Sequence, residues 1–217
     1  MHATTLRRVL GLVLAGVVVG TAAEAQDSAH AHIMHAADAF ADTPGGLGLL
    51  PTAMAEAEVA AQHAELAMED PLNLDAMRRH AGHVLHALDP AMSGGGPGLG
   101  YGVMAAASGA ARHVGLALLS ELTSDNLGLH ARHIATSLDN VVRWTEEAVP
   151  LARQIQSAPS AASAAPLVAR LNTLCRAIVR GMDADRDGRV GWQEGEGGLA
   201  QATYHMNLLK RGEGLIR

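Results

Sequence analysis

Residues 73–88 read NLDAMRRHAGHVLHAL, and the spacing of their apolar side chains decides the fold class. Apolar residues recur three or four positions apart, as in a helix that buries one face: Leu74, Met77, Ala81, Val84 and Leu88. Asn73 is a favourable residue to cap the helix start, and Pro90 follows its end. This stretch therefore predicts an amphipathic helix with defined ends.

The same pattern extends over most of the chain. Apolar residues make up 48% of the sequence and aromatic residues only 2%, so the core must be built from Ala, Leu, Val and Met. Such a composition favours packed helices over sheets. We expect further helices at 30–42, 51–68, 103–122, from 124 or 125 past Val149, from 167 and at 199–209. The predicted fold is all-α, with a helical bundle first and a helix-loop-helix at the carboxy terminus.

The amino terminus is typical of an export signal. Arg7 and Arg8 precede an apolar run that is too short to span a membrane, and the small residues Ala23 and Ala25 follow it. We expect residues 1–25 to be removed, which leaves a chain without a membrane span in a bacterial periplasm or outside the cell.

Two segments of small residues interrupt the helical pattern. Residues 158–166 read APSAASAAP and are predicted to be a linker between a five-helix bundle at 26–157 and a hairpin at 167–217. Residues 93–102 are rich in glycine, but they lack the Lys and Ser or Thr of a phosphate-binding loop. We expect them to form a flexible loop.

The single cysteine, Cys175, lies in an apolar stretch and is expected to be buried.

Residues 183–194 read DADRDGRVGWQE and form the most specific pattern in the chain. Asp183, Asp185 and Asp187 can converge on a hard cation, and the next residue, Gly188, permits a sharp turn. Glu194 can bind with both carboxylate oxygens, which favours Ca²⁺ over Mg²⁺.

This segment resembles the calcium loop of the EF-hand family. The resemblance covers about 45 residues around that loop. It implies that Asp183, Asp185, Asp187 and Glu194 bind Ca²⁺ with their side chains, and that Arg189 contributes its backbone carbonyl. It also implies a flanking helix on each side. EF-hands usually occur in pairs, but the sequence contains no second loop. At an extracellular calcium level such a site would be constitutively filled, so we expect a structural site.

Histidine is in excess, with 12 residues in the chain, and several pairs lie three positions apart. Projection of each expected helix places one semi-buried histidine on each of four successive helices: His63, His80, His113 and His130. The projection turns His83, His86 and His133 away from the apolar stripe. Facing helices of a bundle commonly hold metal or haem sites, so these four residues are candidate ligands for b-type haem, copper or zinc.

Two other interpretations of the histidines remain open. They can be hydrogen-bonded residues at the rim of the bundle, or His30, His32 and His35, with Asp38, can form a loose metal-scavenging tail. A c-type haem is excluded because the chain has no Cys-x-x-Cys-His sequence.

The sequence supports two functions. The first is an exported, non-catalytic binding or interaction module with a structural Ca²⁺ site. The alternative is a histidine-rich metalloprotein that binds haem, copper or zinc for storage, delivery or electron transfer. We expect no enzymatic activity, because neither a Gly-x-Ser-x-Gly nor a His-Glu-x-x-His motif is present. The net charge of −6 and the scattered basic residues argue against a nucleic-acid partner. Metal ions are the expected ligands, and the sequence identifies no protein partner.

Overall fold

The computed structural model describes residues 22–120 and 124–216, and this part of the chain is all-α, as predicted. It contains seven α-helices, and two short 3-10 helices lie at Pro44–Gly46 and Pro90–Met92. The α-helices are α1 (Ala22–Ala37), α2 (Leu49–Leu66), α3 (Leu74–Leu88), α4 (Val103–Leu118), α5 (Asp125–Ser157), α6 (Ala161–Arg180) and α7 (Leu199–Gly212).

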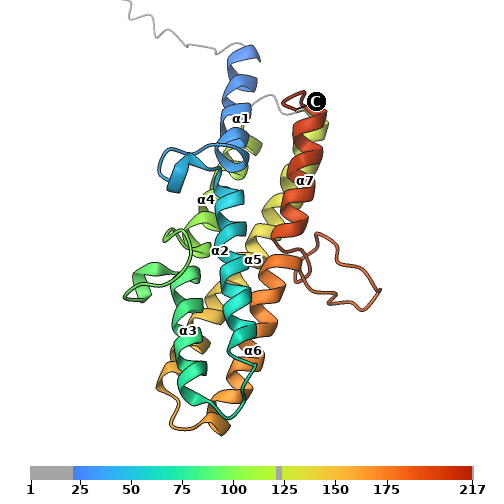
Figure 1. Ribbon diagram of the computed structural model, residues 1–217. Helices are drawn as coiled ribbons and strands as arrows, with labels where there is room; N and C mark the ends of the chain where they lie inside the picture. The colour runs from blue at the N-terminus through green and yellow to red at the C-terminus, as the bar shows by residue number, and fades with distance from the viewer. Residues whose placement is uncertain (1–21, 121–123, 217) are drawn as a thin grey trace, which may run out of the picture.

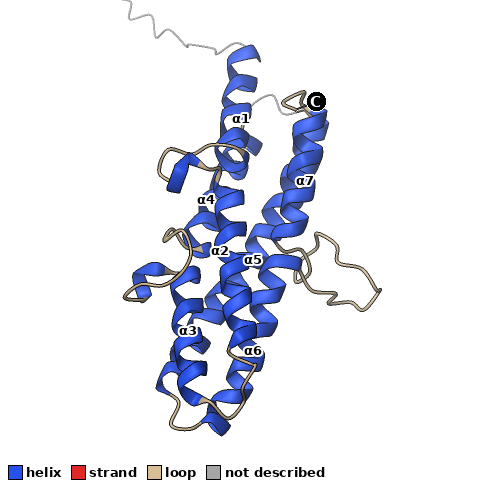
Figure 2. Cartoon of the chain, in the orientation of Figure 1, coloured by secondary structure: helices blue, strands red, loops and turns tan. Residues whose placement is uncertain are grey.

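Helix α5 organises the bundle. It has 33 residues, which corresponds to a length of about 50 Å, and α3, α4, α6 and α7 all pack against it. At one end of the molecule α2, α3, α5 and α6 form a four-helix arrangement (Figure 1). At the other end α1 packs on α4, and α7 lies along the first part of α5 (Figure 2).

Local sequence explains where the helices begin. Asn73 caps α3 as predicted, because its side-chain oxygen accepts a hydrogen bond from the backbone nitrogen of Ala76. Ser124 caps α5 in the same way through the nitrogen of Leu127. These caps satisfy backbone donors that a helix start leaves without partners.

The core consists mainly of alanine and aliphatic side chains. The buried face of α2 includes a row of alanines with no exposed surface: Ala53, Ala57, Ala60 and Ala64. Short side chains allow neighbouring helices to approach closely, and alanine has the highest helix propensity. Cys175 is fully buried in α6, as expected, and burial raises the pKa of its thiol to about 12.

The predicted linker at 158–166 is wrong in most of its length. Helix α6 begins at Ala161, and a capping box between Ser160 and Ser163 starts it. Pro166 lies inside the helix near its start. The segment between α5 and α6 is therefore a tight turn, and alanine-rich composition here encodes a helix.

The predicted division into a bundle and a separate hairpin is not what the structure has. Helices α6 and α7 both pack on α5, and Leu171, Ile178 and Leu199 are fully buried in the same continuous core as the earlier helices. The described residues thus share one continuous hydrophobic core.

The glycine-rich segment 93–102 is anchored at its end by one buried carboxylate. Glu56, on α2, has no exposed surface and accepts hydrogen bonds from the backbone nitrogens of Leu99 (3.2 Å), Tyr101 (2.8 Å) and Gly102 (2.9 Å). The expectation of a flexible loop therefore fails for these residues, which Glu56 fixes at the start of α4.

The expected leader, residues 1–25, lies outside the described residues except for its last four, which belong to the first turn of α1. Among the described helices, none combines the length and apolar character that a membrane span requires.

Candidate metal centres

Three groups of histidines lie on three different helix pairs of the bundle. In each group, every histidine offers one ring nitrogen, and these nitrogens lie within 4.8 Å of one another. We call them the α1–α4 triad, the α2–α3 triad and the α5–α7 triad. Their members are His32, His35 and His113; His63, His80 and His83; and His130, His133 and His205, respectively.

The three triads share one construction. Two histidines three positions apart come from one helix, and the third comes from the neighbouring helix. Residues three apart lie on the same side of a helix, so both rings of the pair can point at one place. The third ring then closes the group across the helix interface. The pairs are His32 with His35, His80 with His83, and His130 with His133.

The α2–α3 triad is the most nearly symmetric. The Nδ1 atom of His63 lies 3.0 Å from Nδ1 of His80 and 3.4 Å from Nδ1 of His83. The rings of His63 and His80 are stacked, with centroids 5.2 Å apart, and His83 meets His63 edge to face. All three nitrogens therefore face a common point between α2 and α3.

The α1–α4 triad has a similar geometry, but the Nδ1 atom of one of its histidines has no hydrogen-bond partner in the described part of the chain. Nδ1 of His32 lies 3.1 Å from Nδ1 of His113. Nδ1 of His35 is buried and has no hydrogen-bond partner among the described residues. Phe40 lies edge to face against both His35 and His113, with centroids 5.6 and 5.3 Å away, and covers one side of the group.

The α5–α7 triad is the most buried. Nδ1 of His130 lies 3.1 Å from Nδ1 of His205, whose residue is only 8% exposed. Nδ1 of His133 is buried and has no hydrogen-bond partner within the described chain. A buried polar nitrogen without a partner costs free energy. Nδ1 of His86, outside the triads, is buried in the same way, so this feature is not specific to the triads.

Burial lowers the pKa of six triad histidines and so favours their neutral form. Burial, followed by the neighbouring histidines His133 and His130, lowers the pKa of His205 to about 4. Burial also lowers the pKa of His63 and of His80, with a further contribution from His83. It lowers the pKa of His113, His130 and His133 in the same way. A neutral imidazole is the form that binds a metal ion.

Each triad suits a single transition-metal ion. Two nitrogens bound to one Zn²⁺ at ~2.0–2.1 Å in tetrahedral geometry lie about 3.3 Å apart. The Nδ1 separations of 3.0, 3.1 and 3.4 Å are close to that value. Hydrogen bonds among the three rings cannot satisfy all three nitrogens. A neutral Nδ1 either donates or accepts, so three converging atoms cannot all be paired with one another. A cation would satisfy all three.

The structure distributes the four histidines predicted from helix projection over three sites. His63 and His80 meet in the α2–α3 triad, whereas His113 and His130 belong to the other two triads. They therefore do not form one common centre. The projection also placed His83 and His133 outside the site, but both are triad members. The repeated His-x-x-His spacing was the sequence signal that identifies these pairs.

Histidines outside the triads have other surroundings. Nε2 of His30 lies 3.1 Å from a carboxylate oxygen of Glu213, and Asp38 pairs with Lys210. His30 and Asp38 thus do not join His32 and His35, and the predicted loose amino-terminal tail is instead a packed helix. His86, three residues after His83, is not part of a triad and lies against Gly96.

The acidic loop brings three of its predicted ligands together. Carboxylate oxygens of Asp183, Asp185 and Asp187 lie within 4.8 Å of one another. The loop is closed by its own backbone: Gly188 donates to Asp183 at 3.1 Å, and Arg189 donates to Asp187 at 2.8 Å. Oδ1 of Asp183 is buried without a partner among the described residues.

Glu194 and the exit helix depart from the EF-hand expectation. The Glu194 side chain is 81% exposed and pairs with Arg143 of α5 at 2.9 Å, away from the three aspartates. Helix α7 starts only at Leu199, after Gly195, Gly197 and Gly198. In this geometry the loop offers three carboxylates, and Glu194 would have to leave Arg143 to complete the set.

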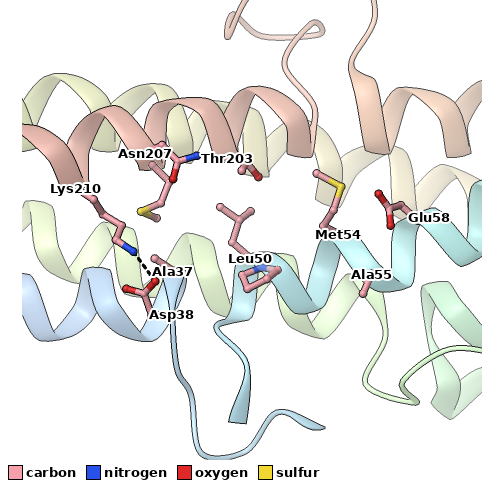
Figure 3. Close-up of a pocket in the computed structure, with 11 residues that line it drawn as sticks. Ala37, Asp38, Leu50, Met54, Ala55, Glu58, Thr203, Asn207 and Lys210 are labelled. Carbon is pink, nitrogen blue, oxygen red and sulfur yellow. Dashed lines mark hydrogen bonds and ion pairs between the residues drawn. The ribbon is translucent and has the colours of Figure 1, made fainter. Parts of the chain in front are cut away.

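A separate apolar cavity of about 320 Å³ lies between α2 and α7. Leu50 and Met54 line it from α2, and Thr203 and Asn207 line it from α7 (Figure 3). The ion pair between Lys210 and Asp38 closes one end. No triad histidine lines this cavity, so it is distinct from the candidate metal centres.

Comparisons with protein-family models, curated proteins and solved structures give no match for this chain.

Proposed function

We propose that this protein binds three transition-metal ions, one in each histidine triad, and serves to store or deliver them. The single observation that carries the proposal is the repetition of one construction on three helix pairs, each with three ring nitrogens converging. The close Nδ1 separations support it.

The ligand chemistry favours zinc or copper. Imidazole is a borderline ligand that suits Zn²⁺ and Cu²⁺, and the triads contain no carboxylate that would suit a hard cation. Haem fits less well, because two axial histidines must have a porphyrin plane between their nitrogens. The three imidazoles of each triad instead converge, with one ring nitrogen from each within 4.8 Å of the other two.

Storage or delivery fits three similar sites better than catalysis or electron transfer. Three histidines leave one position of a tetrahedral ion open to water or to an exchanging ligand. The chain contains this arrangement three times, which increases the number of ions that one chain can hold. An exported location, expected from residues 1–25, would place the sites where they can capture incoming ions.

The direct test is a count of bound ions. The purified, chelator-treated chain is titrated with Zn²⁺ by calorimetry and then analysed for elements. We expect three ions per chain, and two in the His63→Ala variant. His86→Ala is the matched control, because this histidine lies on the same helix outside the triad and its loss should leave three ions. A stoichiometry below one, or equal losses in both variants, would reject the proposal.

A second candidate function is a structural Ca²⁺ site in the acidic loop. Its specific support is the convergence of Asp183, Asp185 and Asp187 together with the EF-hand-like sequence. Calcium at the millimolar level should raise the melting temperature of the chain. Replacing Asp183 and Glu194 together by alanine should abolish this rise. A rise that survives in the double variant would remove the assignment.

A further inference from the structure

The α5–α7 triad has an aromatic ring stacked face to face on one of its imidazoles, whereas Phe40 meets the α1–α4 triad only edge to face. The indole of Trp192, from the acidic loop, stacks on the imidazole of His133, with centroids 3.9 Å apart and planes 15° apart. Tyr204 meets His205 edge to face at 5.3 Å. Around the α2–α3 triad, the described ring contacts are only among its own histidines.

The position of Trp192 is fixed by the helix beneath the loop. Asn140 is fully buried on α5 and donates hydrogen bonds to the carbonyls of Gln193 (2.9 Å) and Gly197 (3.1 Å). It also accepts one from the nitrogen of Gly195 at 2.8 Å. These bonds hold the residues that directly follow Trp192, so the indole is placed over the triad before any ion binds.

Stacking on His133 brings the indole face close to the ion position. The lone pair of Nδ1 lies in the imidazole plane, so a bound ion sits in that plane, ~2 Å beyond the nitrogen. With the indole parallel at 3.9 Å, the ion would lie about 5 Å from the indole centroid, within the ~6 Å range of a cation–π contact.

We propose that Trp192 is a further metal-binding residue, which covers the ion in the α5–α7 triad with its indole face. This inference rests on the proposed function. It makes the three sites unequal: the α5–α7 site holds its ion more tightly, and the α2–α3 site exchanges its ion most readily. The ligand class is a divalent transition-metal cation, and the added contact is electrostatic attraction to the indole face.

Fluorescence provides the first test, because the chain has only two tryptophans, Trp192 and Trp144. Trp144→Phe leaves Trp192 as the only tryptophan, and we titrate this variant with Cu²⁺, a quencher, while exciting tryptophan selectively. We expect most of the emission to be lost as one of three ions binds. His205→Ala in the same background should remove this quenching, whereas His63→Ala should leave it unchanged.

The matched control is Trp192→Phe, which leaves Trp144. Trp144 lies on the same helix 11 residues beyond His133, a distance of about 16 Å along α5. We expect its emission to fall much less over the same titration. Equal quenching of both tryptophans, or quenching of Trp192 that is insensitive to His205→Ala, would overturn the inference.

Affinity provides the second test. The variants Trp192→Ala and Trp192→Phe are compared with the unaltered chain by Zn²⁺ competition with a chromophoric chelator. We expect Trp192→Ala to weaken one of the three sites about two- to fivefold, the range that a partly exposed cation–π contact supplies. Trp192→Phe should restore part of the loss. If the Trp192→Ala variant binds three ions with unchanged affinities, only the role of Trp192 is rejected. If the unaltered chain binds no ion, the proposed function is rejected as well.

Discussion

The histidine triads and the acidic loop both gather potential ligands, but they do so on different supports. Each triad is built from two packed helices, so its side chains are positioned by the core of the protein. The carboxylates Asp183, Asp185 and Asp187 come from alternate positions of one loop, and Asp185 and Asp187 are exposed. Backbone donors of the same loop occupy part of their hydrogen-bonding capacity.

This difference determines how binding acts on stability. An ion in a triad connects two different helices, and the joined histidines are 81 positions apart in the α1–α4 triad, 75 in the α5–α7 triad and 17 in the α2–α3 triad. Binding must therefore favour the folded chain over the unfolded one. An ion in the loop connects residues only a few positions apart. It should order the loop with less effect on the packing of the helices.

The largest expected effect is therefore stabilisation by zinc. At a free ion concentration 100 times the dissociation constant, each site contributes about 2.7 kcal/mol, so three sites together give about 8 kcal/mol. For a chain of this size this corresponds to a rise in melting temperature of roughly 15–30 °C. Scanning calorimetry with and without Zn²⁺ measures the rise, and the variant His63→Ala, His113→Ala, His205→Ala should lack it.

Calcium serves as the internal comparison in that measurement. We expect its effect on the melting temperature to be several times smaller than that of zinc. We expect ions in the triads to stabilise the fold more than an ion in the acidic loop. This expectation would be contradicted if calcium stabilised the chain as strongly as zinc did, or if the triple variant kept its response to zinc.

The next effect is a dependence of stability on pH. Burial and neighbouring histidines lower the pKa of His205 from 6.5 to about 4. Well above pH 6.5 the His205 imidazole is neutral in both the folded and the unfolded chain. As the pH falls below 6.5, the unfolded chain takes up a proton that the folded chain takes up only near pH 4, so stability is lost over this window. The loss from this group is about 3 kcal/mol.

Urea unfolding of the metal-free chain between pH 7.5 and 4 measures this effect. We expect a shallower loss of stability with acid in His205→Gln, which removes the titrating group. His86→Gln is the control, because this histidine belongs to no triad. Identical pH profiles in all three proteins would mean that the buried triad does not contribute to acid sensitivity.

Much of the helical fold follows from sequence periodicity, whereas the start of α6 does not. The apolar spacing from Leu74 to Leu88 and the cap at Asn73 are local signals, and the structure confirms both. The segment 158–166 was predicted to be a linker because Ala, Ser and Pro are common in linkers. Alanine is also the best helix former, and Ser160 with Ser163 supplies a capping box, so the same residues start a helix.

The triads were only half predictable. His63 and His80 were assigned to the buried side of their helices, but His83 and His133 were assigned to the outside. That projection assumes one apolar stripe per helix. In the structure α3 packs on both α2 and α5, and α5 packs on four helices, so the buried arc is wider. The pairing of His113 with α1, or of His205 with α5, depends on tertiary packing that no local pattern specifies.

A third prediction concerns the attachment of the acidic loop. Asn140→Ala removes the hydrogen bonds to Gln193, Gly195 and Gly197 and should lower the free energy of unfolding by about 2 kcal/mol. The emission of Trp192 should shift to longer wavelength as the loop moves from α5. Asn126→Ala, which removes a hydrogen bond from the same helix to Leu209 instead, should leave that emission unchanged. A similar spectral shift in both variants would contradict the role of Asn140 as the loop anchor.

The smallest effect tests whether Glu194 is available to the acidic loop. Arg143→Ala removes an exposed ion pair with Glu194 and a hydrogen bond of 2.6 Å to Oδ1 of Asn140. We expect the free energy of unfolding to fall by about 1 kcal/mol, mainly through the lost hydrogen bond. If Glu194 is a calcium ligand, it must leave Arg143 first, and the same substitution should then tighten calcium binding by about two- to fivefold. Arg189→Ala is the control, because it removes an equal charge from the loop without releasing Glu194. Calorimetric titration with Ca²⁺ separates these cases: a gain in Arg143→Ala beyond that in Arg189→Ala supports Glu194 as a ligand, and equal gains show that the loop responds only to charge.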